Sequence, residues 1–248
     1  MTQEERTDLR AFERVFRYVM DRIVERRLLP GDRITEPPLA EELGLSRTPI
    51  RQALARLVSE GFLENRPDQR GYRLPPLDRQ DMQEVFSARE VLERAAAGFA
   101  AAAARGEDVE LLRRIHREEL EAAREGRIQD YAAANDRFHL ELVRIGGNRY
   151  LCRAFPPVYW RSQLYVHALV DFLPVEEAPS DRGTQSPREH RHILEAVAAR
   201  DEEGAATAAG EHLRATWGYR IALGGRQDLL EGFLPSRGRA PSGKSTRD

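Results

Sequence analysis

Apolar residues in the first part of the chain recur every three or four positions, which is the spacing of an amphipathic helix. Over residues 9–27 this pattern is formed by Phe12, Val15, Phe16, Val19 and Ile23. The run Leu-Leu-Pro-Gly-Asp at residues 28–32 then interrupts it, because proline and glycine favour turns. The pattern therefore predicts a first helix over residues 9–27, followed by a turn.

Two shorter helices are predicted next, separated by a glycine. The first covers residues 39–43 and ends at Gly44, since glycine readily adopts the left-handed conformation at a helix C-terminus. Ser46 is a suitable N-cap for the second helix, which tolerates Pro49 in its first turn and stops at Gly61. The apolar residues of this second helix share one face: Ile50, Leu54, Leu57 and Val58.

Two strand-like segments follow, and they complete the outline of a winged helix-turn-helix. Residues 62–64 and 72–74 flank residues 66–71, which have the composition of a hairpin tip. The proline pair at 75–76 then forms a linker, because it ends the strand and cannot continue into a helix. We therefore assign residues 1–76 to a winged helix-turn-helix domain, α-helical with a small β-hairpin wing.

Beyond the linker the sequence predicts only helices, so the second domain is expected to be an all-α helical bundle over residues 77–225. Pro156 and Pro157 should break or kink its fourth helix. Residues 226–248 form a C-terminal tail whose end, rich in Gly, Pro, Ser and Arg, is expected to be disordered. The fold class is thus mainly α. The predicted helices cover residues 81–104, 107–125, 129–145, 149–171, 186–200 and 201–223.

Composition limits the compartment and the partners. A chain of 248 residues suits two domains, and its net charge of −2 gives no overall basic field, so contacts with nucleic acid must come from local clusters. The single cysteine, Cys152, excludes a disulfide framework and fits a reducing cytoplasm. The N-terminus has no apolar signal core, and the longest apolar stretch, near residues 95–104, is too short to span a membrane. We therefore expect a cytoplasmic protein with no membrane partner.

Basic and polar residues open the second helix of the helix-turn-helix. Arg47, Thr48, Arg51 and Gln52 occupy its exposed positions, and no acidic residue occurs between 46 and 55. Arginine can donate two hydrogen bonds to guanine in the major groove, and a helix N-terminus attracts phosphate. A solvated, arginine-rich helix face is the alternative, and the position of these residues in the helix-turn-helix favours DNA binding. The hairpin region adds Arg66, Arg70, Gly71 and Arg73.

These residues also carry a resemblance to a known family. The chain resembles the DNA-binding domain of the GntR family in the segments Leu29-Pro30-Gly31, Leu39-Ala40, Leu43-Gly44-Leu45-Ser46-Arg47-Thr48-Pro49-Ile50-Arg51, Ala53-Leu54, Leu57 and Glu60-Gly61-Phe62. The resemblance implies that Arg47, Thr48 and Arg51 contact the operator and that Gly71 lies at the wing. The pair at 37–38 is Pro-Pro, where many members have a polar or basic residue. The predicted DNA-binding set is Ser46, Arg47, Thr48, Arg51, Arg70 and Gly71.

Histidines and neighbouring polar residues of the second domain form a candidate metal site. Asn135 and Asp136 lie four and three residues before His139, so all three can share one helix face. His190 opens a second predicted helix and His212 lies on a third. Imidazoles and a carboxylate that converge inside a bundle suit Zn²⁺, Ni²⁺ or Mn²⁺. The alternative, from spacing alone, is a set of surface or helix-capping histidines.

The same region resembles the FCD effector domain, which is found in the fatty-acid-regulator branch of the GntR family. The residues that carry this resemblance are Arg89, Leu92, Glu93, Phe138, His139, Gly147, Asn148, His190, Ile193, Leu194, Ala196, His212 and Leu213. The resemblance implies one divalent ion per chain, with the ligands Asn135, His139, His190 and His212. Asn135 stands where metal-binding members have Asp, so its missing charge should lower the affinity for metal. Asp136 is the alternative fourth ligand.

Arg89 is the candidate residue for effector binding. Its guanidinium can pair with both oxygens of a carboxylate, which predicts a small carboxylic acid as the effector. The alternative is an ordinary ion pair with Glu93, four residues later on the predicted helix. Of the other histidines, His116 and His192 are expected at the surface and His167 in the core.

Together these features predict a DNA-binding transcription regulator controlled by a ligand, namely a repressor that a small carboxylate releases. A single winged helix contacts too few base pairs for specific binding in a genome, so we expect a homodimer on double-stranded DNA with a near-palindromic operator. Two alternatives stay open: a metal sensor, in which the ion is the signal, and a metal-dependent hydrolase. The sequence has no His-Glu-x-x-His motif and no evident general base. We therefore expect no catalytic residues.

Overall fold

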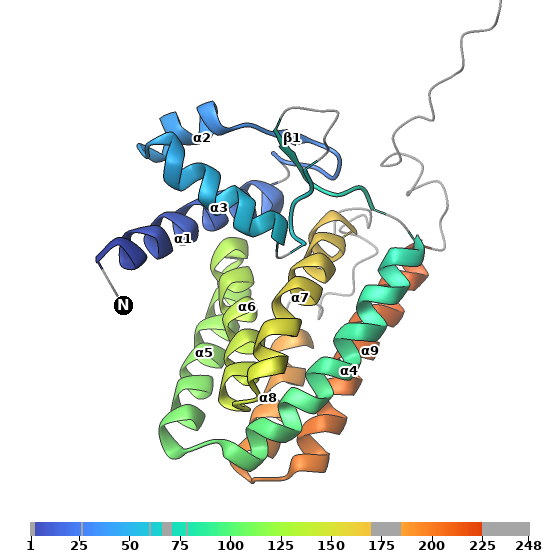
Figure 1. Cartoon of the computed structure of the whole chain (residues 1–248). Coiled ribbons are helices and arrows are strands. Elements are labelled where there is room, and N and C mark those ends of the chain that lie inside the picture. The colour runs from blue at the N-terminus through green and yellow to red at the C-terminus, as the bar shows by residue number, and fades with distance from the viewer. Residues whose placement is uncertain are drawn as a thin grey trace, which may run out of the picture.

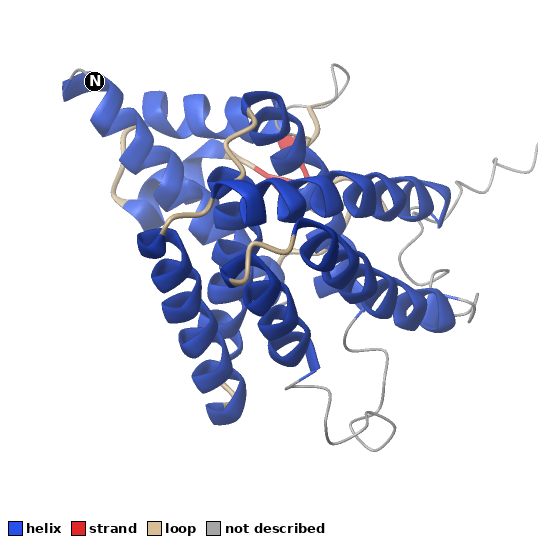
Figure 2. Cartoon of the chain, turned by 90° about the horizontal axis from the view of Figure 1, so that it is seen from below, coloured by secondary structure: helices blue, strands red, loops and turns tan. Residues whose placement is uncertain are grey.

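The computed structural model arranges the chain as a small N-terminal module at one end of a helical bundle (Figure 1). It describes residues 3–25, 27–59, 61–65, 71–77, 79–169 and 185–224. The module contains α1 (Gln3–Val24), β1 (Arg33–Ile34), α2 (Glu36–Leu43), α3 (Arg47–Ser59) and β2 (Tyr72–Arg73). The bundle contains α4 (Arg79–Ala103), α5 (Gly106–Glu125), α6 (Ile128–Ile145), α7 (Arg149–Leu169), α8 (Gln185–Ala198) and α9 (Glu202–Gly224). The predicted mainly α fold class is confirmed, and Figure 2 shows strands only in the N-terminal module of the described chain.

The core of the N-terminal module is formed by the apolar helix faces that the sequence predicted. Val15 on α1 and Ile50, Leu54 and Leu57 on α3 are fully buried. Each such side chain contributes roughly 1.5–3 kcal/mol when it leaves water. This burial holds α1 against α3 and turns the polar face of α3 outward.

Helix α2 begins at Glu36 rather than at residue 39. The proline pair at 37–38 lies in its first turn, where a missing N–H removes no intrahelical hydrogen bond and the fixed φ angle suits the helix. The predicted start was therefore three residues late, because the prolines extend the helix instead of preceding it. Gly44 ends the helix with a φ of 59°, as predicted.

The wing is built from three chain segments rather than two. Glu64 pairs with Arg73 through backbone hydrogen bonds of 2.9 and 3.0 Å, which confirms the predicted pairing of the two segments. β2 also pairs antiparallel with β1, where Ile34 lies opposite Tyr72. β1 was not predicted, because a two-residue strand directly after a Pro-Gly turn has no recognisable alternation. Of the predicted tip at residues 66–71, residues 66–70 lie outside the described part of the chain.

The bundle has its own apolar core, between α4, α5, α6, α8 and α9. Its fully buried side chains include Leu112, Ile115, Phe138, Leu142 and Ile193. Helices α4, α5, α6, α8 and α9 lie close to their predicted positions, whereas the tail at residues 226–248 falls outside the described part of the chain. Across the described residues, no helix combines the length and the apolar composition that a membrane span requires.

Helix α7 runs without interruption through Pro156 and Pro157, so of the predicted break or kink the break is wrong, and the kink stays a prediction. Each proline removes one backbone N–H donor, which weakens the helix locally. Phe155, Tyr159 and Trp160 on the same helix are nevertheless buried at 6% exposure or less. Packing of these aromatic rings on both domains holds the segment helical.

The N-terminal module packs against the side of α7. The ring centroid of Trp160 lies 4.4 Å from that of Phe16 on α1 and 6.2 Å from that of Phe62. Next along α7, Nη2 of Arg161 donates to the carbonyl of Pro76 in the linker at 2.8 Å. One apolar cluster therefore continues from the N-terminal module into the bundle, and aromatic residues of α7 lie at this junction.

Candidate DNA-binding surface and buried histidine cluster

Helix α3 presents its first polar residues to solvent. The exposed residues are Arg47, Thr48, Arg51 and Gln52 on the helix and Ser46 directly before it. The apolar residues between and after them face the core, because the spacing of the buried positions follows the helical repeat. The predicted exposure of these side chains is confirmed, and their contact with DNA stays a prediction.

Arg51 is held by a carboxylate that the sequence analysis did not consider. Nε of Arg51 lies 3.0 Å from Oε1 of Glu36, and Nη2 lies 3.4 Å from Oε2. The Arg51 side chain is still 64% exposed, so DNA can reach it. Binding of Arg51 to a base or a phosphate would have to replace the Glu36 contact. Glu36 lies fifteen residues earlier on another helix, where no local pattern links it to Arg51.

Gly71 has a structural reason to be glycine. Its φ is 102°, and a Cβ at this position would lie 2.9 Å from the backbone oxygen of Ile34. The wing therefore approaches β1 too closely for any side chain here. Glycine is thus required at position 71 by the fold itself, in addition to its predicted position at the DNA. Arg66 and Arg70, the predicted wing contacts, lie outside the described residues.

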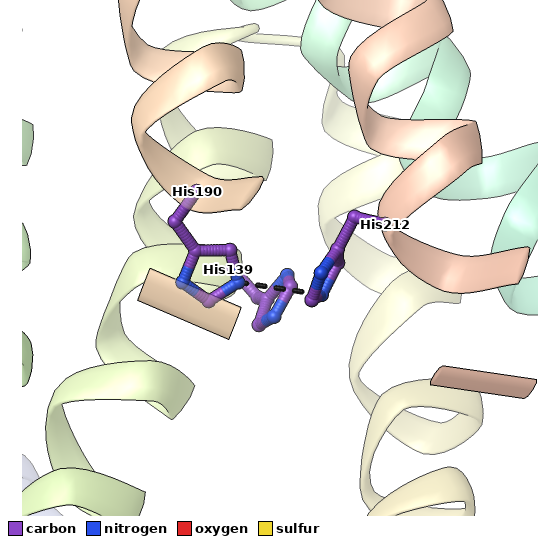
Figure 3. Close-up of side chains that lie close together, drawn as sticks. All are labelled: His139, His190 and His212. Atoms are coloured by element: carbon purple, nitrogen blue, oxygen red, sulfur yellow. Dashed lines mark hydrogen bonds between the residues drawn. The ribbon is translucent and has the colours of Figure 1, made fainter. Parts of the chain in front are cut away.

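Three histidines from three helices meet inside the bundle (Figure 3). His139 of α6, His190 of α8 and His212 of α9 are exposed by only 1%, 0% and 3%, and one ring nitrogen of each lies within 4.8 Å of the others. Nε2 of His190 lies 3.3 Å from Nε2 of His212. Two ligands that each lie about 2.0–2.1 Å from one ion are separated by roughly 3.0–3.5 Å, so this distance fits a shared ion. The alternative of surface or capping histidines is wrong for these three residues.

Each of these histidines has a glutamate at its other ring nitrogen. The three contacts join Nδ1 of His139 to Glu93, Nδ1 of His190 to Glu119 at 2.8 Å, and Nδ1 of His212 to Glu189 at 2.7 Å. Glu119 and Glu189 were missed by the sequence analysis, which named Glu93 only as an ion-pair partner. A signal existed for Glu119, because it occupies the buried face of α5 in register with Leu112, Ile115 and Ala122.

Burial sets the protonation state of the cluster. It lowers the pKa of His139 to about 3 and that of His190 well below its usual value, because a charged ring is poorly solvated there. Burial also raises the pKa of Glu119 to about 7. It opposes ionisation of Glu93 as well, but the neighbouring His139 and Arg89 outweigh it and lower the pKa of that carboxyl. His139 and His190 are therefore neutral near pH 7, which is the state that binds metal.

The predicted fourth ligands lie beside the cluster and contact Tyr159. Its hydroxyl donates to Oδ1 of Asp136 at 2.6 Å and accepts from Nδ2 of Asn135 at 3.1 Å. Limited contact with water raises the pKa of Asp136 to about 7. Within the described chain, the acidic and histidine atoms close enough to share an ion are those of the three histidines, and Asp136 is not among them. The fourth ligand stays a prediction.

Arg89 is buried beside the cluster and is already engaged. Nε donates to Oε2 of Glu93 at 3.0 Å, which is the ion pair that the sequence left open as an alternative. Nη1 donates to Oγ of Ser162 at 3.0 Å, and the guanidinium carbon lies 4.6 Å from the ring centroid of Tyr159. Glu93 therefore contacts both Arg89 and His139. Binding of an effector carboxylate by Arg89 stays a prediction.

The other histidines partly follow expectation. His192 is exposed, as predicted. His116 is half-buried rather than exposed, since its Nε2 lies 2.8 Å from the carbonyl oxygen of Pro187 at the start of α8. The prediction for His116 was wrong because packing of α5 against α8 covers a face that looks fully charged in sequence. His167 is half-buried.

An exposed basic recognition helix on a winged helix-turn-helix, joined to an all-helical domain, defines a two-domain DNA-binding transcription regulator. Residues 11–73 match the model described as bacterial regulatory proteins, gntR family, and residues 84–215 match the FCD domain. The chain therefore belongs to the GntR family of bacterial transcription regulators, in the group that carries an FCD domain.

Known relatives agree with this assignment. YdhC of Bacillus subtilis, an uncharacterised regulator of the helix-turn-helix type, is 31% identical over 179 residues, which is 71% of this chain and 75% of that protein. A probable D-xylose utilization operon transcriptional repressor of Paenarthrobacter nicotinovorans is 31% identical over 198 residues, or 80% and 83% of the two chains. The structure of McbR/YncC from Escherichia coli has the same fold, with a TM-score of 0.72 at 23% identity over 87% of this chain and 97% of that one. These proteins are regulators rather than enzymes, so the hydrolase hypothesis is not kept.

The exposed start of α3 leads to a prediction for DNA affinity. Arg47→Ala and Arg51→Ala should each weaken binding to the DNA upstream of the protein's own gene by about five- to 150-fold, the range for a base-reading arginine. Glu36→Gln should strengthen binding a few-fold, because Arg51 no longer has to leave a carboxylate. Fluorescence anisotropy with specific and scrambled duplexes measures both effects.

Glu41→Gln is the matched control for the Glu36 variant. Glu41 is exposed on the same helix, so its change removes the same formal charge without altering the Arg51 contact. Equal gains for Glu36→Gln and Glu41→Gln would mean that general charge, not release of Arg51, sets the affinity. Unchanged specific binding in both arginine variants would refute the assignment of α3 as the recognition helix.

Proposed function

We propose that this GntR-family regulator is a repressor that leaves its operator when a small carboxylic acid binds beside a metal ion in the FCD domain. The observation that carries the proposal is the convergence of His139, His190 and His212 in a buried site. Neutral nitrogen ligands held on three helices are what a structural or ligand-binding metal site requires.

The metal would be one divalent ion per chain, Zn²⁺, Ni²⁺ or Mn²⁺. The three histidines supply nitrogen ligands, and Asn135 or Asp136 supplies an oxygen. An amide oxygen can bind a metal but brings no negative charge, so Asn135 lowers the expected affinity compared with Asp. Weak retention of the ion during purification follows from this.

The effector would bind between the ion and Arg89. An open coordination position can accept a carboxylate oxygen, while the guanidinium donates to the same group from the other side. Arg89 is 2% exposed and bound to Glu93 and Ser162, so an acid would have to displace at least one of these contacts. Such displacement is a means by which an effector changes the interior of the bundle.

Burial of the cluster favours a second candidate, in which the metal ion alone is the signal. Since His139, His190 and His212 are all exposed by 3% or less, an ion fits with less rearrangement than an organic acid does. Titration of DNA affinity with metal, in the presence and absence of candidate acids, separates the two functions. A metal sensor responds fully without any acid.

Helix α7 offers a route from the cluster to the DNA-binding domain. The ring of Tyr159 lies 5.4 Å from that of His139 and 4.9 Å from that of Trp160. Trp160 in turn contacts Phe16 of α1. A ligand that moves Tyr159 therefore acts on the packing of α1, which belongs to the N-terminal module. Such a change in packing would alter the placement of α3 on DNA.

Operator binding is expected from a homodimer. One recognition helix reads a few base pairs, so two copies on a near-palindromic site supply the specificity of a regulator. The helical domain should carry much of the interface. Light scattering should give the mass of two chains at micromolar concentration, both with and without the operator. A monomer under both conditions would contradict this prediction.

Loss of histidines should abolish metal binding. Untagged protein should bind about one equivalent of zinc or nickel, as expected for one site of this ligand type. His139→Ala and His190→Ala each remove a direct ligand. Their loss of metal affinity should therefore exceed the 10- to 100-fold loss that is typical when a hydrogen-bond partner of a ligand is removed. Elemental analysis followed by metal titration tests this. Asn135→Asp should tighten binding if Asn135 is the fourth ligand and leave it unchanged if Asp136 is.

His192→Ala is the control for these variants, since His192 is exposed two positions after His190. It should bind metal like the unmodified protein. If the His139 and His190 variants also bind like the unmodified protein, the site is elsewhere or absent. If they lose the metal but keep the response of DNA affinity to acids, the ion is structural and Arg89 acts with other groups.

Contact between α1 and α7 should determine how strongly the metal site affects DNA affinity. Phe16→Ala removes the ring that meets Trp160, so the ratio of DNA dissociation constants with and without nickel should move toward one, while nickel affinity stays unchanged. Phe12→Ala is the matched control, because Phe12 is a partly buried ring on the same helix that packs on Phe16 and Arg56. An unchanged ratio in Phe16→Ala would exclude this contact as the route.

A further inference from the structure

We infer that Glu93, Glu119 and Glu189 are positioning residues of the histidine cluster, each holding one imidazole by Nδ1 so that Nε2 faces a bound cation. This inference rests on the proposed function, namely that the cluster binds a metal. It assigns a role to these three carboxylates, which are not themselves predicted ligands.

The geometry of the contacts fixes the tautomer of each ring. An ionised carboxylate can only accept a hydrogen bond, so the nitrogen facing it carries the proton. The three carboxylates all face Nδ1, from α4, α5 and α8. In a neutral imidazole the remaining nitrogen, Nε2, then has a free lone pair. All three rings are thus set in the same ligand form, and Figure 3 shows them turned toward one another.

Carboxylates in this position also make the rings better ligands. A carboxylate that accepts from Nδ1–H increases electron density at Nε2 and fixes the ring orientation, and such partners are a regular feature of metal-bound histidines. The repetition of the His–Glu contact favours a metal-positioning role over chance. One His–Glu contact is common in a bundle, but here every member of one three-histidine cluster has its own carboxylate.

The charge of the site points to a cation. Glu93 and Glu119 are 0% exposed, and an ionised carboxylate is costly to bury without compensation. Arg89 compensates Glu93. Among the described residues, Glu119 has His190 as its only ion-pair partner, and its Oε1 is buried without a hydrogen-bond partner. A divalent ion at the Nε2 side of the rings supplies the missing positive charge close to these groups.

The contacts also predict which carboxylate matters most. Glu93 shares its charge with Arg89, and the side chain of Glu189 is 22% exposed, so water screens it. Glu119 has neither an arginine nor water to reduce its effect on His190. Its removal should therefore weaken metal binding more than removal of Glu189.

Substitution to glutamine separates the charge from the shape. Co²⁺ is the probe, because its visible absorption reports the geometry and ligands of the bound ion, while titration gives the affinity. Glu119→Gln should lower Co²⁺ affinity about 10- to 100-fold and alter the spectrum, and Glu189→Gln should do so less. Glu119→Leu, which cannot hydrogen-bond to Nδ1, should lose more affinity than Glu119→Gln. Thermal unfolding without metal reports stability separately.

Glu118→Gln is the matched control, since Glu118 is the exposed neighbour on α5 and pairs with Arg137. It should leave affinity and spectrum unchanged. The contrary result is that the unmodified protein binds Co²⁺ while Glu119→Gln and Glu189→Gln both keep its affinity and its spectrum. In that case the carboxylates only stabilise the bundle and the inference is wrong. If the unmodified protein binds no Co²⁺, Ni²⁺ or Zn²⁺, the proposed function fails and the inference fails with it. If Glu119→Gln does not fold, Glu189→Gln alone decides.

Discussion

Three imidazole rings lie in the centre of a helical bundle, where every polar atom that has left water needs a partner in the protein. This requirement organises the domain around it. His139, His190 and His212 come from three helices, and their carboxylate partners come from α4, α5 and α8. Five of the six bundle helices are therefore tied to one polar cluster inside an apolar core. A shift of any of these helices would leave a buried charge or donor without its partner, which is costly.

The sixth bundle helix, α7, connects this cluster to the DNA-binding domain. Tyr159 bonds to Asp136 beside the histidines, Trp160 packs on Phe16 of α1, and Arg161 holds the linker carbonyl. Consecutive residues of one helix thus contact the polar cluster, the N-terminal module and the connection between them. Because α7 stays helical through two prolines, these contacts are carried on one continuous element. In this member of the GntR family, direct packing along α7 thus connects the buried cluster of the FCD domain to the N-terminal module.

The DNA-binding surface differs from the buried cluster in its exposure to solvent. Its residues are exposed, and their side chains contribute little to folding. Arg51 is nevertheless held by Glu36, so the free protein presents an arginine whose charge is partly compensated. An exposed pair of this kind is weak, and DNA phosphates can compete with it.

The sequence by itself determined the order of the helices, the winged helix-turn-helix, and the polar face of α3, because helical periodicity and turn residues act over a few neighbouring positions. It also placed the three histidines on three separate helices. Only the tertiary structure decided that they meet, since the rotation and register of each helix depend on packing across the whole bundle. The contacts of His139 with Glu93 and of His190 with Glu119 span 46 and 71 residues. No local pattern relates residues so far apart, and for the same reason the pairing of β1 with β2 and of Arg51 with Glu36 emerged only from the fold.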